Sequence, residues 1–186
     1  NIRYVTGVRG APEFAPGLRY ALAFTEHDPI IYELGSTLEY NRVHCTWIKP
    51  ENWRFSYCWL NGIAGTAAAQ ETAKKWAEAI AKDLSARGLA GEKLGVDGID
   101  DVARQALADK GIEVASVTPA MREARRTKTP EEVNCMRMAI NITNAGYADL
   151  CAQAWPGMRE CDLGASAMQA IWKAGAEFAN AAARSG

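Results

Sequence analysis

The sequence predicts an α/β domain followed by the beginning of a second, helical domain. Between residues 1 and 118, short apolar strand-like runs alternate with amphipathic helical patterns, which is typical of layered α/β structure. From residue 129 onward only helical periodicity remains, and the polar stretch 119–128 between the two parts is interpreted as a connector. We therefore expect domains at 1–118 and 129–186, with a mostly buried sheet in the first.

The predicted strands are apolar runs bounded by turn residues. They lie at 1–8, 20–34, 93–97 and 112–117. The second of them turns at Glu26–Pro29, which predicts a β-hairpin.

The predicted helices carry apolar residues at spacings of three and four. They lie at 66–88, 99–110, 129–154 and 160–174. The third has the clearest start, because Thr129 can serve as N-cap, Pro130 fits the first helical position and Glu132 completes a capping box.

Composition argues against nucleic-acid and membrane partners. The net charge of the 186 residues is −1, without a basic stripe, and no apolar run approaches the roughly 20 residues of a membrane span. The sequence starts without methionine and stops within a pattern, so we expect a fragment cut at both ends.

Candidate chemical groups are sparse. Five cysteines without C-x-x-C spacing indicate reduced thiols in a cytoplasmic protein rather than a zinc site or a disulfide framework. The loop Gly62–Thr66 lacks the residues of a phosphate-binding loop. His27 in a predicted turn and His44 in a predicted strand have no paired nucleophile. The acidic residues are interpreted as caps and solvated positions: Asp97, Asp100, Asp101 and Asp109. We therefore predict no catalytic or metal-binding residues within this chain.

Several motifs occur in the order found in one family. Arg126-Thr127-Lys128-Thr129-Pro130-Glu131-Glu132, followed by Met136–Ala139, resembles the linker signature of the creatinase/prolidase ("pita-bread") metallopeptidases. Trp155–Glu160 is similar to that family's Pro-Gly-x-x-Glu turn, with Arg159 where Thr is common. Three further segments resemble family motifs: Asn1–Gly7 (an N-terminal strand), Lys173–Glu177 (a helix ending) and Ser185-Gly186 (a Ser-Gly close).

The resemblance implies an N-terminal domain with a mixed sheet flanked by helices, then the first helices of an α+β catalytic domain. It implies a homodimeric, cytoplasmic, metal-dependent peptidase that hydrolyses Xaa-Pro bonds in short peptides. Two divalent ions (Mn, Fe, Co or Zn) would be held by residues that follow the Ser-Gly strand, so the fragment alone would bind no metal and be inactive.

Two alternatives remain open. The first is the same fold with other chemistry, either a creatinase-like C–N hydrolase or a dimethylsulfoniopropionate lyase. The lyase shares Asn-Ile-Arg-Tyr at residues 1–4 but carries a tryptophan where this chain has Glu13-Phe14. The second is a non-catalytic relative that binds a small molecule.

An aromatic-rich run at 43–60 supplies the candidate substrate-binding residues. Trp53, Phe55, Tyr57 and Trp59 share one parity, so on a strand they would face one side and could pack beneath the helix at 66–88. Alternatively, the interruption at Lys49–Asn52 predicts an exposed loop around Trp47 and Trp53. The family resemblance implies that such residues could reach a substrate across a homodimer, by apolar or cation–π contact.

Overall fold

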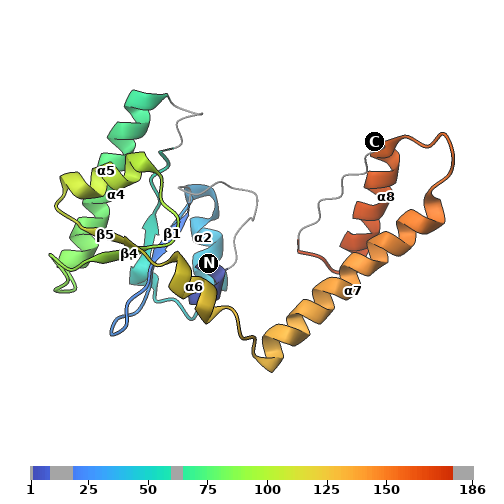
Figure 1. The fold of residues 1–186 in the computed structure, drawn as a ribbon, viewed down its shortest axis with the longest axis horizontal. Helices are drawn as coiled ribbons and strands as arrows, with labels where there is room; N and C mark the ends of the chain where they lie inside the picture. Colours follow the sequence, from blue (N-terminus) through green and yellow to red (C-terminus); the bar gives the residue numbers. More distant parts are fainter. Residues whose placement is uncertain (1, 9–18, 60–64, 178–186) are drawn as a thin grey trace. The chain divides into compact units, whose positions relative to one another are not determined.

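The computed structural model describes residues 2–8, 19–59 and 65–177 and divides the chain into two units, Asn1–Ala124 and Arg125–Gly186 (Figure 1). The first unit holds all the strands of the described residues, and the second consists of two helices. Each unit is described below by itself.

The first sheet of unit 1 is mixed. Its strands are β1 (Tyr20–Leu22), β2 (Ile30–Glu33) and β3 (Trp53–Phe55), in the order β1-β2-β3. The pair β1–β2 is antiparallel, with Tyr20 opposite Tyr32, which confirms the predicted hairpin. The pair β2–β3 is parallel, with Ile31 opposite Trp53. The helix α2 (Gly35–His44) and the 3-10 helix η1 (Pro50–Asn52) lie in the connection between these parallel strands.

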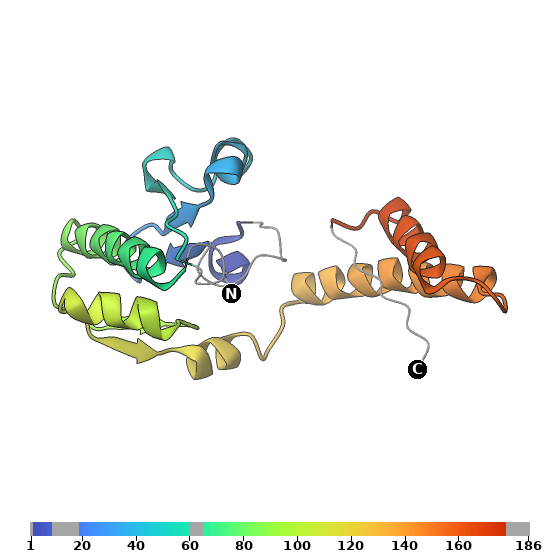
Figure 2. The same cartoon turned by 90° about the horizontal axis from the view of Figure 1, so that it is seen from above.

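A second sheet pairs β4 (Leu94–Val96) with β5 (Val114–Ser116) in parallel. The helix α5 (Asp101–Asp109) connects them, and α4 (Thr66–Ser85) precedes β4. These strands and helices occupy the segments predicted from the sequence. α4 and α5 run alongside each other (Figure 2).

The strand β2 is buried on both faces and divides the core of unit 1 into two clusters. Ile30 and Tyr32 face the larger cluster, which contains the apolar face of α4 and part of α5. Ile31 faces a smaller cluster, which contains Val8, Cys45, Ile48 and Trp53. Neighbouring side chains along a strand point to opposite faces. The strand β2 therefore lies between the two clusters and contributes residues to each of them.

The start of the chain differs from the prediction. Residues Ile2–Thr6 form a short helix, α1, and not a strand. The Thr6 hydroxyl donates to the Ile2 carbonyl oxygen at 2.7 Å, and Gly7 N–H donates to the Arg3 carbonyl oxygen at 2.8 Å. Gly7 adopts a φ of 70°, the left-handed conformation that commonly ends helices. These local hydrogen bonds override the strand preference of the β-branched residues.

Two other helices were not predicted. α6 (Thr118–Ala124) occupies the first part of the expected connector. α2 was missed because the side that it turns toward β2 carries polar groups and only one large apolar residue, Leu38. Thr37 and Asn41, one turn apart, both donate to the Glu33 carboxylate, at 3.0 and 2.8 Å. Hydrophobic periodicity does not mark such a helix.

Unit 2 consists of α7 (Pro130–Gln153) and α8 (Glu160–Lys173), which pack against each other. The predicted capping box is present: Glu132 N–H donates to the Thr129 hydroxyl at 3.2 Å, and Thr129 N–H donates to the Glu132 carboxylate at 2.8 Å. Much of the predicted apolar face of α7 is exposed, including Met136, Ile140 and Tyr147. None of the described helices combines the length and apolar character needed to cross a bilayer.

Candidate functional site

The two predicted substrate-binding tryptophans have different surroundings. Trp47 is 57% exposed, and its indole Nε1 donates to the Thr6 carbonyl oxygen at 2.8 Å. Trp53 is 7% exposed and packs in the smaller core cluster, so the expectation that it lies in an exposed loop is wrong. The loop around it is shortened by η1, in which Asn52 N–H donates to the Lys49 carbonyl oxygen at 2.9 Å.

The expectation that four aromatic residues share one face is also wrong, because β3 ends at Phe55. Trp53 packs in the smaller cluster, and Phe55 is 60% exposed. Trp59, beyond the strand, packs in the larger cluster with its ring 4.6 Å from that of Trp76 on α4. The predicted packing beneath the helix at 66–88 therefore holds for Trp59 and, in part, for Tyr57, which packs against the same cluster, but not for Trp53 or Phe55.

Trp59 also connects the core to the start of α5. Its indole Nε1 donates to Asp100 Oδ2 at 2.9 Å, while Asp100 Oδ1 accepts the Ala103 N–H at 2.8 Å. Asp100 is the N-cap of α5, a role predicted for this group of acidic residues. Its position is structural.

A buried ionic cluster joins the sheet to α4. The Asp83 carboxylate accepts the Tyr32 hydroxyl at 2.5 Å and a bidentate pair of hydrogen bonds from Arg54, at 3.2 and 3.0 Å. Burial first, and the Asp83 carboxylate second, raise the pKa of Tyr32 above its usual range. The hydroxyl therefore stays protonated and donates. Sequence reasoning missed this cluster, because its members lie in β2, β3 and α4 at no recognisable spacing.

Arg87 extends this cluster toward the surface. Its guanidinium donates to the Asp83 carbonyl oxygen at 3.2 Å and lies 3.7 Å from an Asp83 carboxylate oxygen. Its Cζ lies 5.1 Å from the centre of the Phe24 ring, a cation–π distance. The Arg87 guanidinium also donates a hydrogen bond to Asn52 Oδ1 at 3.4 Å.

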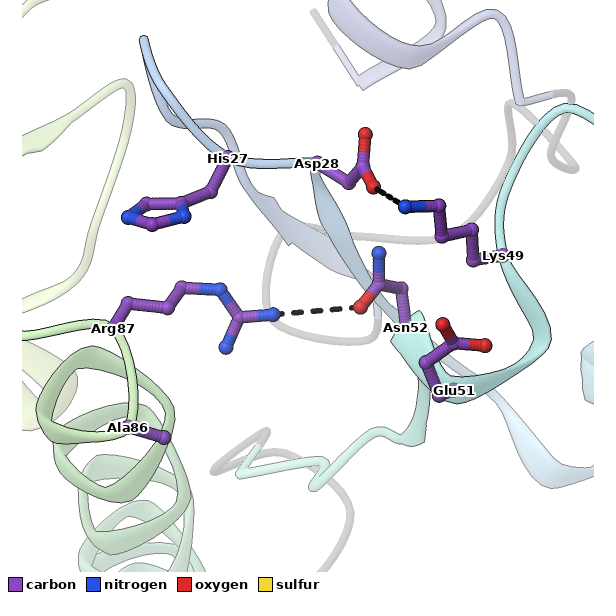
Figure 3. Close-up of a pocket in the computed structure, with 7 residues that line it drawn as sticks. All are labelled: His27, Asp28, Lys49, Glu51, Asn52, Ala86 and Arg87. Carbon is purple, nitrogen blue, oxygen red and sulfur yellow. Dashed lines mark hydrogen bonds and ion pairs between the residues drawn. The ribbon is translucent and has the colours of Figure 1, made fainter.

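A polar pocket of about 370 Å³ opens beside Arg87 (Figure 3). Its polar lining residues come from the β1–β2 turn, the η1 segment and the end of α4: His27, Asp28, Lys49, Glu51, Asn52 and Arg87. Lys49 Nζ lies 2.5 Å from Asp28 Oδ2, and this hydrogen bond is the main cause that raises the pKa of Lys49. The pocket thus combines one closed ion pair with several other donors and acceptors.

The histidines do not form a catalytic pair. His27 packs its ring edge against Phe24 with centroids 5.9 Å apart. His44 is the last residue of α2, not part of a strand, and its ring contacts that of Tyr40 with centroids 4.3 Å apart and planes tilted by 49°. Within the described ranges, no three His, Cys, Asp or Glu side chains are grouped so that they could hold a metal ion, so these residues do not fit the dimetal centre that the resemblance implies.

The remaining candidates of the sequence analysis have structural surroundings or lie outside the described residues. All five cysteines are free thiols, with Cys45 in the core. Residues 62–64 of the loop Gly62–Thr66 lie outside the described ranges, and α4 begins at Thr66 after Gly65, whose φ is 78°. At the start of α8, Arg159 makes no N-cap hydrogen bond. It pairs with Asp162 at 2.7 and 2.8 Å, which lowers the pKa of that carboxyl.

Comparison with known proteins gives a relationship in fold. No family model matches the chain, and no curated protein matches it significantly. Among solved structures, the Xaa-Pro dipeptidase from Bacillus anthracis is similar, with a TM-score of 0.62 and 16% sequence identity. The similarity covers 95% of this chain and 42% of that chain, so this chain spans less than half the length of that dipeptidase. The chain therefore has a prolidase-like fold.

Proposed function

We propose that this chain is the N-terminal part of a metal-dependent peptidase that hydrolyses Xaa-Pro bonds in short peptides. The main observation that supports this proposal is the similarity in fold to an Xaa-Pro dipeptidase over 95% of the chain. The linker motif adds support, since Arg126–Glu132 leads directly into the capping box of α7.

The metal chemistry is assigned to other segments of the protein. Two divalent ions (Mn, Fe, Co or Zn), held by residues outside the described ones, would activate water and polarise the scissile carbonyl. Since the described residues offer no group of metal ligands, we assign no catalytic step to them. Their proposed contribution is to help enclose the substrate.

Trp47 is the residue proposed to contact the substrate. The residue is 57% exposed, while its indole N–H is fixed on the Thr6 carbonyl oxygen. A large aromatic surface held in one orientation suits apolar contact with a proline ring. Tyr40 and Val43 of α2, 66% and 67% exposed, precede it in the chain, and Trp47 follows three residues after the last residue of that helix. We propose that these three exposed residues, Tyr40, Val43 and Trp47, contact a second copy of the chain in a homodimer.

The proposal is tested with the protein product of the complete gene. Purified protein reconstituted with Mn²⁺ should hydrolyse Xaa-Pro dipeptides and leave the matched Xaa-Ala dipeptides largely intact. Creatine and dimethylsulfoniopropionate, assayed in parallel, represent the alternative chemistries. Conversion of either one without Xaa-Pro hydrolysis would show that the fold serves another reaction, and inactivity on all three would favour a binding protein.

A further inference from the structure

The polar pocket of unit 1 brings together three hydrogen-bond donors from three separate segments. His27 lies in the β1–β2 turn, Asn52 ends η1 and Arg87 follows α4. Figure 3 shows the Arg87 side chain extended toward Asn52, with the His27 ring beside it. An imidazole N–H, a carboxamide NH₂ and a guanidinium all donate hydrogen bonds. Converging donors of this kind are the usual surroundings of an anionic oxygen.

Asn52 is the residue that points most directly to a ligand. Its side chain belongs to a residue only 6% exposed. Its Oδ1 accepts from Arg87, but its Nδ2 makes no hydrogen bond within the described part of the chain. Figure 3 shows this amide nitrogen directed toward the side of the pocket formed by the His27–Asp28 turn. This nitrogen lacks a protein acceptor but is reached by solvent through the pocket, so an acceptor from outside the chain can bind it there.

Arg87 is held in place but retains bonding capacity. Its side chain is 16% exposed, fixed by the Asp83 carbonyl oxygen and the Phe24 ring. The Asp83 carboxylate is already occupied by the bidentate Arg54. The bond from Arg87 to Asn52 is long, at 3.4 Å. A carboxylate would be a better acceptor for the planar guanidinium, because the two groups match in geometry and charge.

The carboxylates of the lining limit which anion fits. Asp28 pairs with Lys49 at 2.5 Å, whereas Glu51 makes no ion pair among the described residues and interacts with the same lysine only through its charge. Because Asp28 and Glu51 share this one lysine, their negative charge disfavours a multiply charged phosphate more strongly than a singly charged carboxylate. We propose that this pocket binds a small, singly charged carboxylate through Arg87, Asn52 and His27. This proposal is independent of the proposed peptidase activity.

The test uses the chain labelled with ¹⁵N and titrated with sodium propionate at constant ionic strength. The side-chain amide signals of Asn52 and the Nε–H signal of Arg87 should shift and saturate, with a dissociation constant on the order of millimolar, as for a ligand of few atoms. Propionamide, which has the same shape without the charge, should cause no saturating shift. Inorganic phosphate should bind more weakly than propionate.

Three variants locate the site. Arg87→Gln should weaken propionate binding about tenfold or more, the expected loss of a charge-assisted hydrogen bond. Glu51→Gln should strengthen it severalfold, because it removes only the opposing charge. Arg104→Gln is the matched control: Arg104 is exposed on α5 and lies outside the pocket, so its loss should leave the dissociation constant unchanged.

Each contrary result overturns the proposal. Equal shifts with propionamide would show that the charge is not recognised, and tighter binding of phosphate would contradict the ligand class. Equal weakening by Arg104→Gln and Arg87→Gln would indicate nonspecific screening. If Arg87→Gln unfolds the protein, the site is tested by the Glu51→Gln variant, whose substitution is exposed, and by the propionamide comparison. An unchanged dissociation constant of propionate for Glu51→Gln would then refute the site.

Discussion

At the residue scale, the two candidate tryptophans show how burial separates structural from functional roles. Both were placed in one loop by their spacing around Lys49–Asn52. In the structure Trp53 contributes to the smaller core cluster, whereas Trp47 is more than half exposed. The sequence could not distinguish them, because tryptophan occurs both in cores and at exposed sites. Alternate positions share one face only within a continuous strand, and the sequence did not show where the strand ends.

A matched pair of substitutions tests this difference. Trp53→Ala should reduce the free energy of unfolding by about 3–5 kcal/mol, since it leaves a cavity in the core. Trp47→Ala should cost only about 1 kcal/mol, for the loss of one hydrogen bond and a partial ring contact. Urea unfolding monitored by circular dichroism measures both. Equal losses, or a greater loss for Trp47→Ala, would contradict the assignment of Trp53 to the core. In the complete enzyme, Trp47→Ala should raise KM for Xaa-Pro substrates.

At the element scale, strong local signals were predicted correctly and polar contacts were not. The capping box at Thr129 and the apolar face of α4 are encoded within a few residues, and both are present. α2 was missed because Thr37 and Asn41 reach a buried carboxylate on β2, a contact set by the fold and not by periodicity. α1 was predicted as a strand because the helix-ending signal of Gly7 was outweighed by β-branched neighbours.

The polar pocket was missed for a related reason. His27 and Asp28 were interpreted as turn residues, Lys49–Asn52 as a loop interruption, and Arg87 as part of a helix end. They come together only through the hairpin and the parallel pairing of β2 with β3. No spacing along the chain could have indicated that they share one pocket.

The packing of α7 on α8 gives a prediction at this scale. A Cβ added at Gly146 would lie 2.6 Å from Ile171 Cγ1, so the helices meet there without room for a side chain. Gly146→Val should therefore lower the free energy of unfolding of unit 2 by about 1–3 kcal/mol. Asn144→Val, at an exposed position of the same helix, controls for the helix propensity of valine. In a chain that already carries Ile171→Ala, Gly146→Val should lower the free energy of unfolding less than it does in the unmodified chain, because the smaller side chain leaves room for the valine. Identical effects of Gly146→Val and Asn144→Val would show that the helices do not pack closely at this point.

At the scale of the whole molecule, the chain divides between Ala124 and Arg125, within the stretch 119–128 that was predicted as a connector. The structure adds α6 to this stretch, so its non-helical part is limited to the residues that precede α7. Inside unit 1, the buried Asp83 and Glu33 clusters tie α4 and α2 to the sheet. Unit 2 is held by the α7–α8 contact, and the domain boundaries predicted from the sequence remain to be tested in solution.

Limited proteolysis provides that test. Arg125, Arg126 and Lys128 are exposed between α6 and α7, and backbone outside regular structure is the preferred substrate of proteases. Trypsin should cleave at one of these three residues before it cleaves at any other site that would divide the chain into two large pieces. Mass spectrometry should then find pieces that begin or end there and persist longer than the intact chain. Lys74 and Lys75, exposed within α4, supply the comparison, because cleavage there requires local unfolding of a helix packed on the core. Earlier cleavage at Lys74 or Lys75 than at 125–128 would mean that the stretch before α7 is protected and that residues 1–118 and 129–186 do not behave as separate domains.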